Sequence, residues 1–317
     1  MTPAVVSVPD EVGRRLVALA CRAPSVGNTQ PWAWRLRPDG VDLYADHQRR
    51  EPVADPVGRD VTISCGAALH HVQVAARAMG WSPVVRRFPD AMAPALAAEV
   101  RLSPAVPQRG AAAELTALRE RCTDRRRFTT WPVPEERLAE LAEAARAQGA
   151  GAIAITDATE RLRVELLVSR ALQLQVRNPA LTDESHRSRS GLDALEDDDR
   201  DLEGSDGLIA LCAEGDSRQS WLRAGEGLSA LWLHAVRTGM SVVPLSQVLG
   251  VDETREALRH QVFGGLAVPL LLVRVGWQAI GRSQLVPSIR RPVDDVLLPN
   301  GPRGSGPWAR PAGDSLL

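Results

Sequence analysis

The amino-acid sequence predicts an α+β fold in which two half-domains of similar element order are fused in one chain. Three observations indicate this. Helical and strand patterns follow one another along 317 residues with few βαβ crossovers, which favours antiparallel or mixed sheets flanked by helices. The connector Ser103–Gly110 contains two prolines and a glycine, and the pattern begins again after it in altered form. With 44% apolar residues, the chain can bury a substantial core.

The first half is predicted to contain two helices and three strands. Its first helix is indicated by apolar residues near helical spacing: Val12, Leu16, Val17, Leu19 and Ala20. The turn Pro38-Asp39-Gly40 separates the strands Trp32–Leu36 and Val41–Ala45. The helix Thr62–Trp81 has one apolar side and a closing glycine, and a single strand is expected between it and about Val100.

The second half is richer in helices. Its expected elements, in chain order, are a helical run from Ala111, the helix Glu135–Gln148, the strand Ala152–Thr156, the helix Thr159–Val176, the strand Gly207–Ala213, the helices Trp221–Thr238 and Glu253–His260, and the strand Val268–Val275. We therefore expect a first half at 1–110, a second half at 111–281, and a C-terminal extension at 282–317. The end of that extension is rich in Gly, Pro and Ser and is expected to be mobile.

Charge balance and residue usage exclude several classes of function. The 38 basic and 39 acidic residues give a formal net charge of −1, so no global field draws the chain to nucleic acid or to an anionic membrane. Every basic residue is arginine, so Schiff-base, PLP and Walker-type sites lack their lysine. The longest apolar run, Leu266–Val273, is too short to span a bilayer. We expect a cytoplasmic protein with small-molecule partners.

No metal site and no catalytic side chain is predicted. The four cysteines lie far apart without a Cys-x-x-Cys pair, and we interpret them as reduced core or helix residues: Cys21, Cys65, Cys122 and Cys212. His70 and His71 are adjacent on a helix and point to different faces, so they cannot form an i, i+4 ligand pair. A structural or surface role is expected for both histidines.

Residues 23–32, at the corner between the first helix and the first strand, combine turn formers with polar side chains. They read Ala-Pro-Ser-Val-Gly-Asn-Thr-Gln-Pro-Trp. Pro24 and Pro31 stiffen the two shoulders of this turn. Three side chains can offer hydrogen bonds to a planar polar heterocycle: Ser25, Asn28 and Gln30. The alternative is an ordinary polar loop.

Arginines are concentrated in the segment Arg121-Cys122-Thr123-Asp124-Arg125-Arg126-Arg127-Phe128. If this segment bends, four side chains can converge on one phosphate: Arg121, Thr123, Arg125 and Arg126. A solvated charged face is the alternative interpretation. A second basic segment, Ser288–Asp294, contains Arg290 and Arg291.

These three segments resemble the nitroreductase superfamily. Residues 23–32 are similar to its flavin-contacting turn, residues 121–128 to its Arg-x-Ser-x-Arg phosphate element with threonine in place of serine, and Ser288–Asp294 to its closing basic segment. The resemblance implies a bound FMN whose ring contacts Pro24, Ser25, Asn28 and Gln30, and whose phosphate contacts Arg121, Thr123, Arg125, Arg126 and Arg290. An extra arginine before Phe128 leaves open whether Arg125 or Arg126 is the second phosphate ligand.

Two further segments narrow the resemblance to the actinobacterial Acg-type nitroreductase-like proteins. They are Asp55–Arg59 leading into Ile63–Leu69, and Gly239–Gln247. The resemblance covers the chain to about Asp295 and implies a fused pseudo-dimer with one FMN site, which lets the chain work as a monomer. Within Gly239–Gln247, a backbone wall at the flavin N5 edge is expected from Pro244, Leu245 and Ser246, and a helix end before a buried strand is the alternative. A short acidic stretch, Asp193–Asp206, stands where the resemblance implies a longer lid.

The activity implied by this resemblance is FMN-dependent oxidoreduction. NAD(P)H would reduce the flavin, and nitroaromatic or quinone-like acceptors would then be reduced through flavin N5 in a ping-pong cycle. One alternative is an Acg-type protein that sequesters or stores flavin and has little or no nitroreductase activity. Another is an interaction protein with the same fold and no cofactor.

Overall fold

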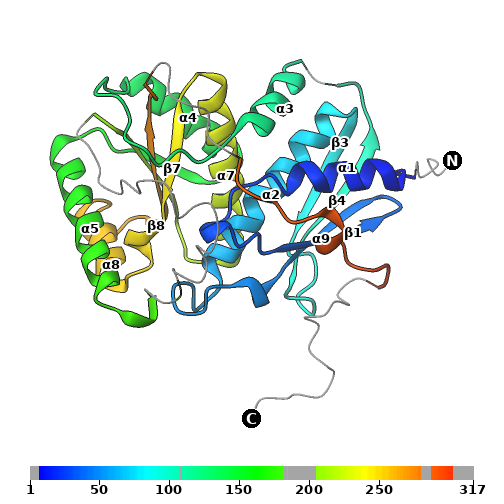
Figure 1. The fold of residues 1–317 in the computed structure, drawn as a ribbon, viewed down its shortest axis with the longest axis horizontal. Helices are drawn as coiled ribbons and strands as arrows, with labels where there is room; N and C mark the ends of the chain where they lie inside the picture. Colours follow the sequence, from blue (N-terminus) through cyan, green and yellow to red (C-terminus); the bar gives the residue numbers. More distant parts are fainter. Residues whose placement is uncertain (1–6, 108, 182–183, 185–204, 280–286, 303–317) are drawn as a thin grey trace, which may run out of the picture.

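Two four-stranded antiparallel sheets with the same strand order form the framework of the computed structural model (Figure 1), which describes residues 7–107, 109–181, 184, 205–279 and 287–302. The first sheet has the order β1-β2-β4-β3, and the second has the order β5-β6-β8-β7. The strands of the first sheet are β1 (Trp32–Arg37), β2 (Gly40–Ala45), β3 (Trp81–Arg87) and β4 (Leu96–Pro104). The strands of the second sheet are β5 (Gly151–Ala154), β6 (Gly207–Ala213), β7 (Ser241–Leu245) and β8 (Val268–Gly276). The predicted α+β class with two related halves is confirmed.

The helices lie beside and between these two sheets (Figure 1). Their bounds are α1 (Asp10–Ala20), α2 (Arg59–Ala78), α3 (Ala111–Glu120), α4 (Glu135–Arg146), α5 (Ala158–Val176), α7 (Arg218–Arg237), α8 (Asp252–Gln261) and α9 (Val293–Val296). The central pair, α2 and α7, occupies equivalent positions, because each connects the second strand of its sheet to the third.

Helices α2 and α7 approach each other most closely at two glycines. A Cβ atom on Gly66 would lie 2.0 Å from the Leu222 carbonyl oxygen, and one on Gly225 would lie 1.9 Å from the Ile63 carbonyl oxygen. Both obstacles are backbone atoms, which cannot swing aside as a side chain can. Glycine at these two positions is therefore what lets the two halves pack helix against helix.

A buried polar network crosses the same helix pair. Glu226 on α7 is 0% exposed and accepts two hydrogen bonds of 2.7 Å from the Arg87 guanidinium and one of 2.9 Å from the Gln73 amide. His70 Nδ1 lies 2.8 Å from the Ser229 hydroxyl oxygen, and burial lowers the pKa of His70 to about 3. The buried carboxylate is thus paired and hydrogen-bonded, as burial of a charge requires.

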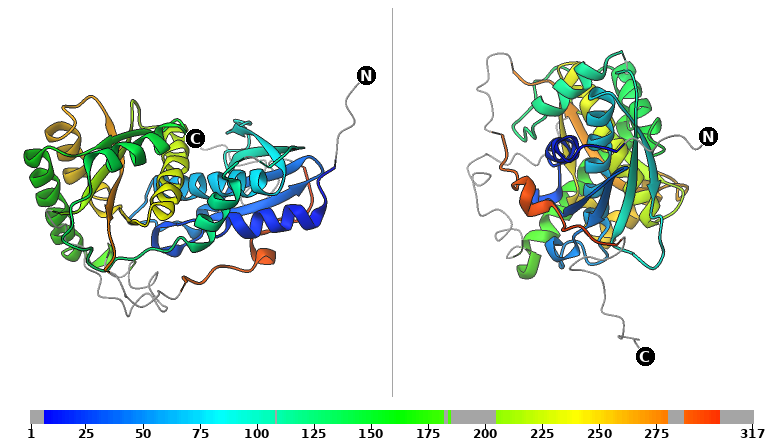
Figure 2. Two further views of the ribbon diagram at one scale, coloured as in Figure 1. Left: turned by 90° about the horizontal axis from the view of Figure 1, so that it is seen from above. Right: turned by 90° about the vertical axis from the view of Figure 1, so that its right-hand side faces the viewer.

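The C-terminal residues 287–302 return from the second half to the first sheet (Figure 2). The Leu298 N–H donates to the Trp34 carbonyl at 2.7 Å, so this segment extends the sheet beside β1. The buried Arg35 guanidinium donates to the carbonyls of Pro299 and Pro302 at 3.0 and 2.7 Å. The expectation of a mobile tail concerns residues that lie mostly outside the described part of the chain.

Two expectations from the sequence differ from the structure, and at a third position the structure matches one of the two alternatives. A single strand was expected between α2 and residue 100, but the structure has two, because β3 pairs along its length with β4. Pro83 fits in β3 because this is an edge strand, where a missing N–H breaks no ladder bond. The alternative reading of residues 239–247 as a helix end before a strand matches β7. Cys122 is exposed on a loop rather than in a core or helix, whereas the other three cysteines are buried.

Candidate functional site

The turn between α1 and β1 has an unusual backbone. Gly27, Asn28 and Gln30 have φ angles of +56°, +53° and +49°, and the last two are not glycine. The Ser25 hydroxyl accepts a hydrogen bond of 3.0 Å from the Gln30 backbone N–H, which helps to hold this conformation. Left-handed backbone at a non-glycine residue costs free energy and is concentrated at functional sites. Pro24 and Ser25 are half-buried at the start of the turn.

The amide side chains of this turn are bonded to the C-terminal segment. Asn28 Nδ2 donates to the Ile289 carbonyl at 3.1 Å, and Asn28 Oδ1 accepts from Arg290 NH1 at 3.0 Å. Gln30 Oε1 accepts from the Arg291 backbone N–H at 2.8 Å, and Gln30 Nε2 donates to the Ile289 carbonyl at 3.3 Å. The turn predicted at 23–32 and the basic segment predicted at 288–294 therefore meet, as the sequence analysis required.

Arg121 is buried between the two halves. It follows α3 directly, is 6% exposed, and its guanidinium carbon lies 4.5 Å from the centre of the Trp232 ring. One nitrogen, NH2, donates to the Arg22 carbonyl at 3.0 Å. Its Nε and NH1 are buried and have no hydrogen-bond partner among the described residues. Burial, followed by repulsion from Arg290, lowers the pKa of Arg121 to about 9, so it stays protonated at neutral pH.

Two arginine side chains from distant segments meet at the backbone carbonyl of a third arginine, whose own guanidinium donates to the Arg119 carbonyl. The Arg22 carbonyl accepts from Arg121 NH2 and, at 3.4 Å, from Arg290 NH2. Within the described part of the chain, neither Arg22 nor Arg121 has a carboxylate ion-pair partner. We call Arg22, Arg121 and Arg290 the arginine cluster. The buried Arg121 guanidinium, with two N–H-bearing nitrogens that have no partner among the described residues and two further arginines beside it, is suited to bind an anion such as a phosphate.

His71 on α2 lies within the electrostatic reach of this cluster. Burial, and then the charge of Arg121, lower the pKa of His71 well below its ordinary value, so the imidazole is neutral. Arg22 was not among the residues predicted from the sequence. The only signal for it is its place immediately before the turn at 23–32, and a single arginine among 38 basic residues carries little information.

The rest of the segment 121–128 is a loop whose groups are engaged locally. Arg126 forms a two-pronged ion pair with Asp124, with N–O distances of 2.8 and 2.7 Å. The buried Arg274 guanidinium donates to the Arg125 carbonyl at 3.1 Å and lies 4.6 Å from the centre of the Phe128 ring. Thr123 and the side chain of Arg125 are half-buried. Of the two alternatives for a second phosphate ligand, Arg126 already has a carboxylate partner.

The segment predicted to line the flavin N5 edge ends β7. Pro244 and Leu245 are the last two residues of that strand, and Ser246 precedes the short 3-10 helix Gln247–Leu249. A first-half residue, Arg59 at the start of α2, donates from NH2 to the Leu249 carbonyl at 2.8 Å. This segment of the second half is therefore attached to the first half. The acidic stretch 193–206, considered as a lid, lies outside the described residues except for its last two.

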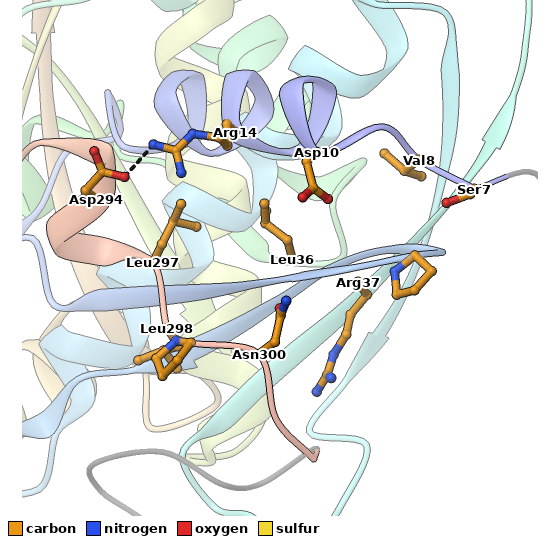
Figure 3. Close-up of a pocket in the computed structure, with 12 residues that line it drawn as sticks. Ser7, Val8, Asp10, Arg14, Leu36, Arg37, Asp294, Leu297, Leu298 and Asn300 are labelled. Carbon is orange, nitrogen blue, oxygen red and sulfur yellow. Dashed lines mark hydrogen bonds and ion pairs between the residues drawn. The ribbon is translucent and has the colours of Figure 1, made fainter.

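A cavity of about 720 Å³ lies elsewhere on the first half. Figure 3 shows it between α1, the β1–β2 turn and the C-terminal segment, with an ion pair between Arg14 and Asp294 at one side. None of its lining residues belongs to the arginine cluster or to the turn at 23–32. Among the described helices, none is both long and apolar enough to cross a membrane. No group of three potential metal ligands occurs in the same residues.

Comparison with known proteins shows which proteins this chain resembles in sequence. No family model matches the chain. A Mycobacterium tuberculosis H37Rv protein named as a putative NAD(P)H nitroreductase is 33% identical, with 90% of this chain and 91% of that protein aligned. The putative NAD(P)H nitroreductase acg of the same organism is 29% identical over 92% of this chain and 96% of its own length.

Solved structures with a similar arrangement include a nitroreductase with bound FMN from Bacteroides fragilis, with 13% identity and a TM-score of 0.42, covering 56% of this chain and 94% of that chain. An NADPH:FMN oxidoreductase from Vibrio harveyi complexed with NAD+ has 12% identity and a TM-score of 0.41, covering 60% and 78% respectively. The relative that is 33% identical aligns with 90% of this chain, which is enough to establish homology. The chain therefore belongs to the nitroreductase family and is related to its Acg-type members.

Proposed function

We propose that this chain binds one FMN and acts as an NAD(P)H-dependent oxidoreductase on nitroaromatic or quinone-like acceptors. The observation that carries this proposal is the arginine cluster, in which a buried Arg121 guanidinium has two unpartnered N–H-bearing nitrogens and no carboxylate beside it among the described residues. A phosphate dianion would neutralise the cluster and accept those hydrogen bonds. The family relation favours a flavin as the molecule that carries this phosphate.

Each segment of the site has a proposed part in holding the cofactor. Arg121 and Arg290 would bind the phosphate, with Thr123 and Arg125 near it on the same loop. Pro24 and Ser25 would face the ring, and the backbone of Pro244, Leu245 and Ser246 would line its N5 edge. Bound FMN would supply hydride transfer, while the protein positions the ring and excludes water around it.

The proposed division of the chain follows from this site. The half at 1–110 supplies the ring turn, the half at 111–281 supplies the arginine loop, and the extension at 282–317 supplies Arg290. One complete site per chain would then be formed between two unequal halves, and no second subunit would be needed.

The visible spectrum of the purified protein tests the cofactor, and anaerobic titration with NADPH and NADH tests the activity. We expect a flavin spectrum that bleaches on addition of reduced nicotinamide and returns when a quinone or nitroaromatic acceptor is added. A colourless protein that binds no added FMN would refute the proposal. A yellow protein reduced by dithionite but not by NAD(P)H would show flavin sequestration instead.

Substitution of the cluster tests the placement of the phosphate. Because a hydrogen bond to a charged group contributes about 1.5–3 kcal/mol, the double variant Arg121→Ala with Arg290→Ala should bind FMN about a hundredfold more weakly or worse. Arg137→Ala is the control, since Arg137 is exposed on α4 and pairs with Glu140. Unchanged FMN affinity in the double variant would show that the phosphate binds elsewhere.

A further inference from the structure

Gln30 has little hydrogen-bonding capacity left for a ligand, and Asn28 uses one donor and one acceptor of its amide within the protein. A glutamine amide has two N–H donors, and Gln30 donates to the carbonyls of Asn28 and Ile289, both at 3.3 Å. Its Oε1 accepts from the Arg291 backbone N–H at 2.8 Å. The Gln30 side chain is also 5% exposed, so it cannot readily turn toward a flavin ring.

Apart from the Asn28 carbonyl, the partners of these two amides belong to residues 289–291. Ile289 accepts from both side chains, the Arg291 N–H donates to one of them, and Arg290 itself donates to Asn28 Oδ1 at 3.0 Å. We call residues 288–291 the strap. The left-handed backbone at Asn28 and Gln30 is what directs both side chains toward it, so the conformational cost of the turn is coupled to docking of the strap.

Docking of the strap brings like charges together. Arg290 is the main electrostatic cause, after burial, of the lowered pKa of Arg121, and Arg22 contributes in the same direction. Such repulsion opposes placing Arg290 beside Arg121 unless other contacts offset it. The neutral amides of Asn28 and Gln30 provide those contacts without introducing a carboxylate that would compete with a bound phosphate.

We propose that Asn28 and Gln30 are positioning residues that hold the strap on the turn and direct the Arg290 guanidinium toward the flavin phosphate, rather than residues that recognise the flavin ring. This inference rests on the proposed function. It differs from the role that the resemblance implied for both residues. It makes the phosphate affinity of the site depend on neutral side chains that do not touch the phosphate.

The test is the affinity of the unsubstituted protein and its variants for FMN and for riboflavin, which has the same ring and no phosphate. The variants are Gln30→Met, which keeps the size of the side chain, and Asn28→Gly, which keeps the left-handed backbone without strain. Gln48→Met is the matched control, because Gln48 is exposed on the nearby 3-10 helix His47–Arg49. Flavin fluorescence quenching measures binding without requiring turnover.

For Gln30→Met and Asn28→Gly we expect FMN affinity to fall about tenfold or more, while riboflavin affinity changes less than about twofold. In an Arg290→Ala background, Gln30→Met should have no further effect on FMN, because the group that it positions is gone. The ³¹P resonance of bound FMN should shift in both variants, while the visible spectrum of the bound ring stays as in the unsubstituted protein. The Gln48→Met control should leave all of these quantities unchanged.

Equal losses for FMN and riboflavin, or a changed ring spectrum with an unchanged ³¹P resonance, would show that the amides contact the ring and would overturn the inference. Additive effects of Gln30→Met and Arg290→Ala, or unchanged FMN affinity in both single variants, would also overturn it. None of those results would contradict the proposed function, because in each case the unsubstituted protein still binds FMN. If the unsubstituted protein binds no flavin, the proposed function fails, and this inference fails with it.

Discussion

The two halves of the molecule share a framework but differ at the connection between the first strand of each half and the helix that directly precedes it. In the first half, residues 21–31 join α1 to β1 and form the polar turn that meets the strap. In the second half, residues 147–150 join α4 to β5, and Gly149, with a φ of +79°, makes the reversal. The longer connection carries Ser25, Asn28 and Gln30, and the shorter one has no such set.

The segments that precede α1 and α4 also differ, but here it is the second half that carries the candidate site residues. Helix α4 is preceded by the loop containing Arg121, whereas residues 1–9 before α1 contain no arginine. Each half therefore carries what the other lacks. The comparison teaches that a repeated scaffold need not give repeated sites, because the proposed site would take its turn from one half and its arginine loop from the other.

The largest expected effect is on the packing of α2 against α7, through which the two halves contact each other. Gly225→Ala places a Cβ atom 1.9 Å from a backbone oxygen of α2, and we expect loss of about 4 kcal/mol or more of folding free energy, or no soluble protein. Gly215→Ala is the control, because no heavy atom lies within 4 Å of its added Cβ. Chemical denaturation measures both. A Gly225→Ala protein as stable as the control would mean that the halves do not pack through this crossing.

A smaller effect is expected at the buried charge between the halves. Glu226→Ala leaves the Arg87 guanidinium, whose side chain is 14% exposed, without its carboxylate, and we expect a loss of about 3–5 kcal/mol in unfolding free energy. Glu140→Ala removes the carboxylate of an exposed pair and should cost less than about 1 kcal/mol. Urea denaturation of both variants provides the measurement. Equal costs would show that Glu226 is not buried as described.

A pH-dependent effect distinguishes the starts of the two central helices. Helix α7 begins at Arg218 and is capped by Ser217, whose side chain accepts from the Ser220 N–H, whereas α2 begins with the poorly accessible pair Arg59 and Asp60. Burial raises the pKa of Asp60 to about 7 from an ordinary 3.8. Because the folded state holds the proton more tightly than the unfolded state, stability from this group is present at low pH and is lost as pH rises toward and through 7.

Asp60→Asn removes this titration. The difference in Tm, variant minus unsubstituted protein, should increase from pH 4 to about pH 7 and then become constant. Thermal melts across that range measure it. A difference that does not change with pH would mean that the Asp60 carboxyl titrates alike in the folded and unfolded chains.

Most helices and six of the eight strands in the described chain could be predicted from periodicity. The helix predicted at Thr159–Val176 is α5 at Ala158–Val176, and the strand Gly207–Ala213 was predicted to the residue. The strand β3 was missed because its exposed positions, Pro83 and paired arginines resemble a loop when read alone. Its conformation depends on pairing with β4, which sequence periodicity does not report.

The candidate site was only partly predictable for a similar reason. Turn residues and an arginine run stand out in a sequence, so residues 23–32 and Arg121 were identified. The role of Arg22 depends on its backbone carbonyl, and the partners of Gln30 depend on a strap about 260 residues further along the chain. The local amino-acid sequence of neither segment specifies such partners.

The sequence by itself determined the helical and strand periods, the two polar segments, and an all-arginine basic complement that excludes lysine chemistry, because each follows from residue type and local spacing. Only the tertiary structure decided that α2 and α7 cross at two glycines, that the C-terminal segment returns to β1, and that the Arg121 and Arg290 side chains meet at the Arg22 carbonyl. The reason is that packing and long-range hydrogen bonds, not local propensity, bring residues this far apart in sequence into contact.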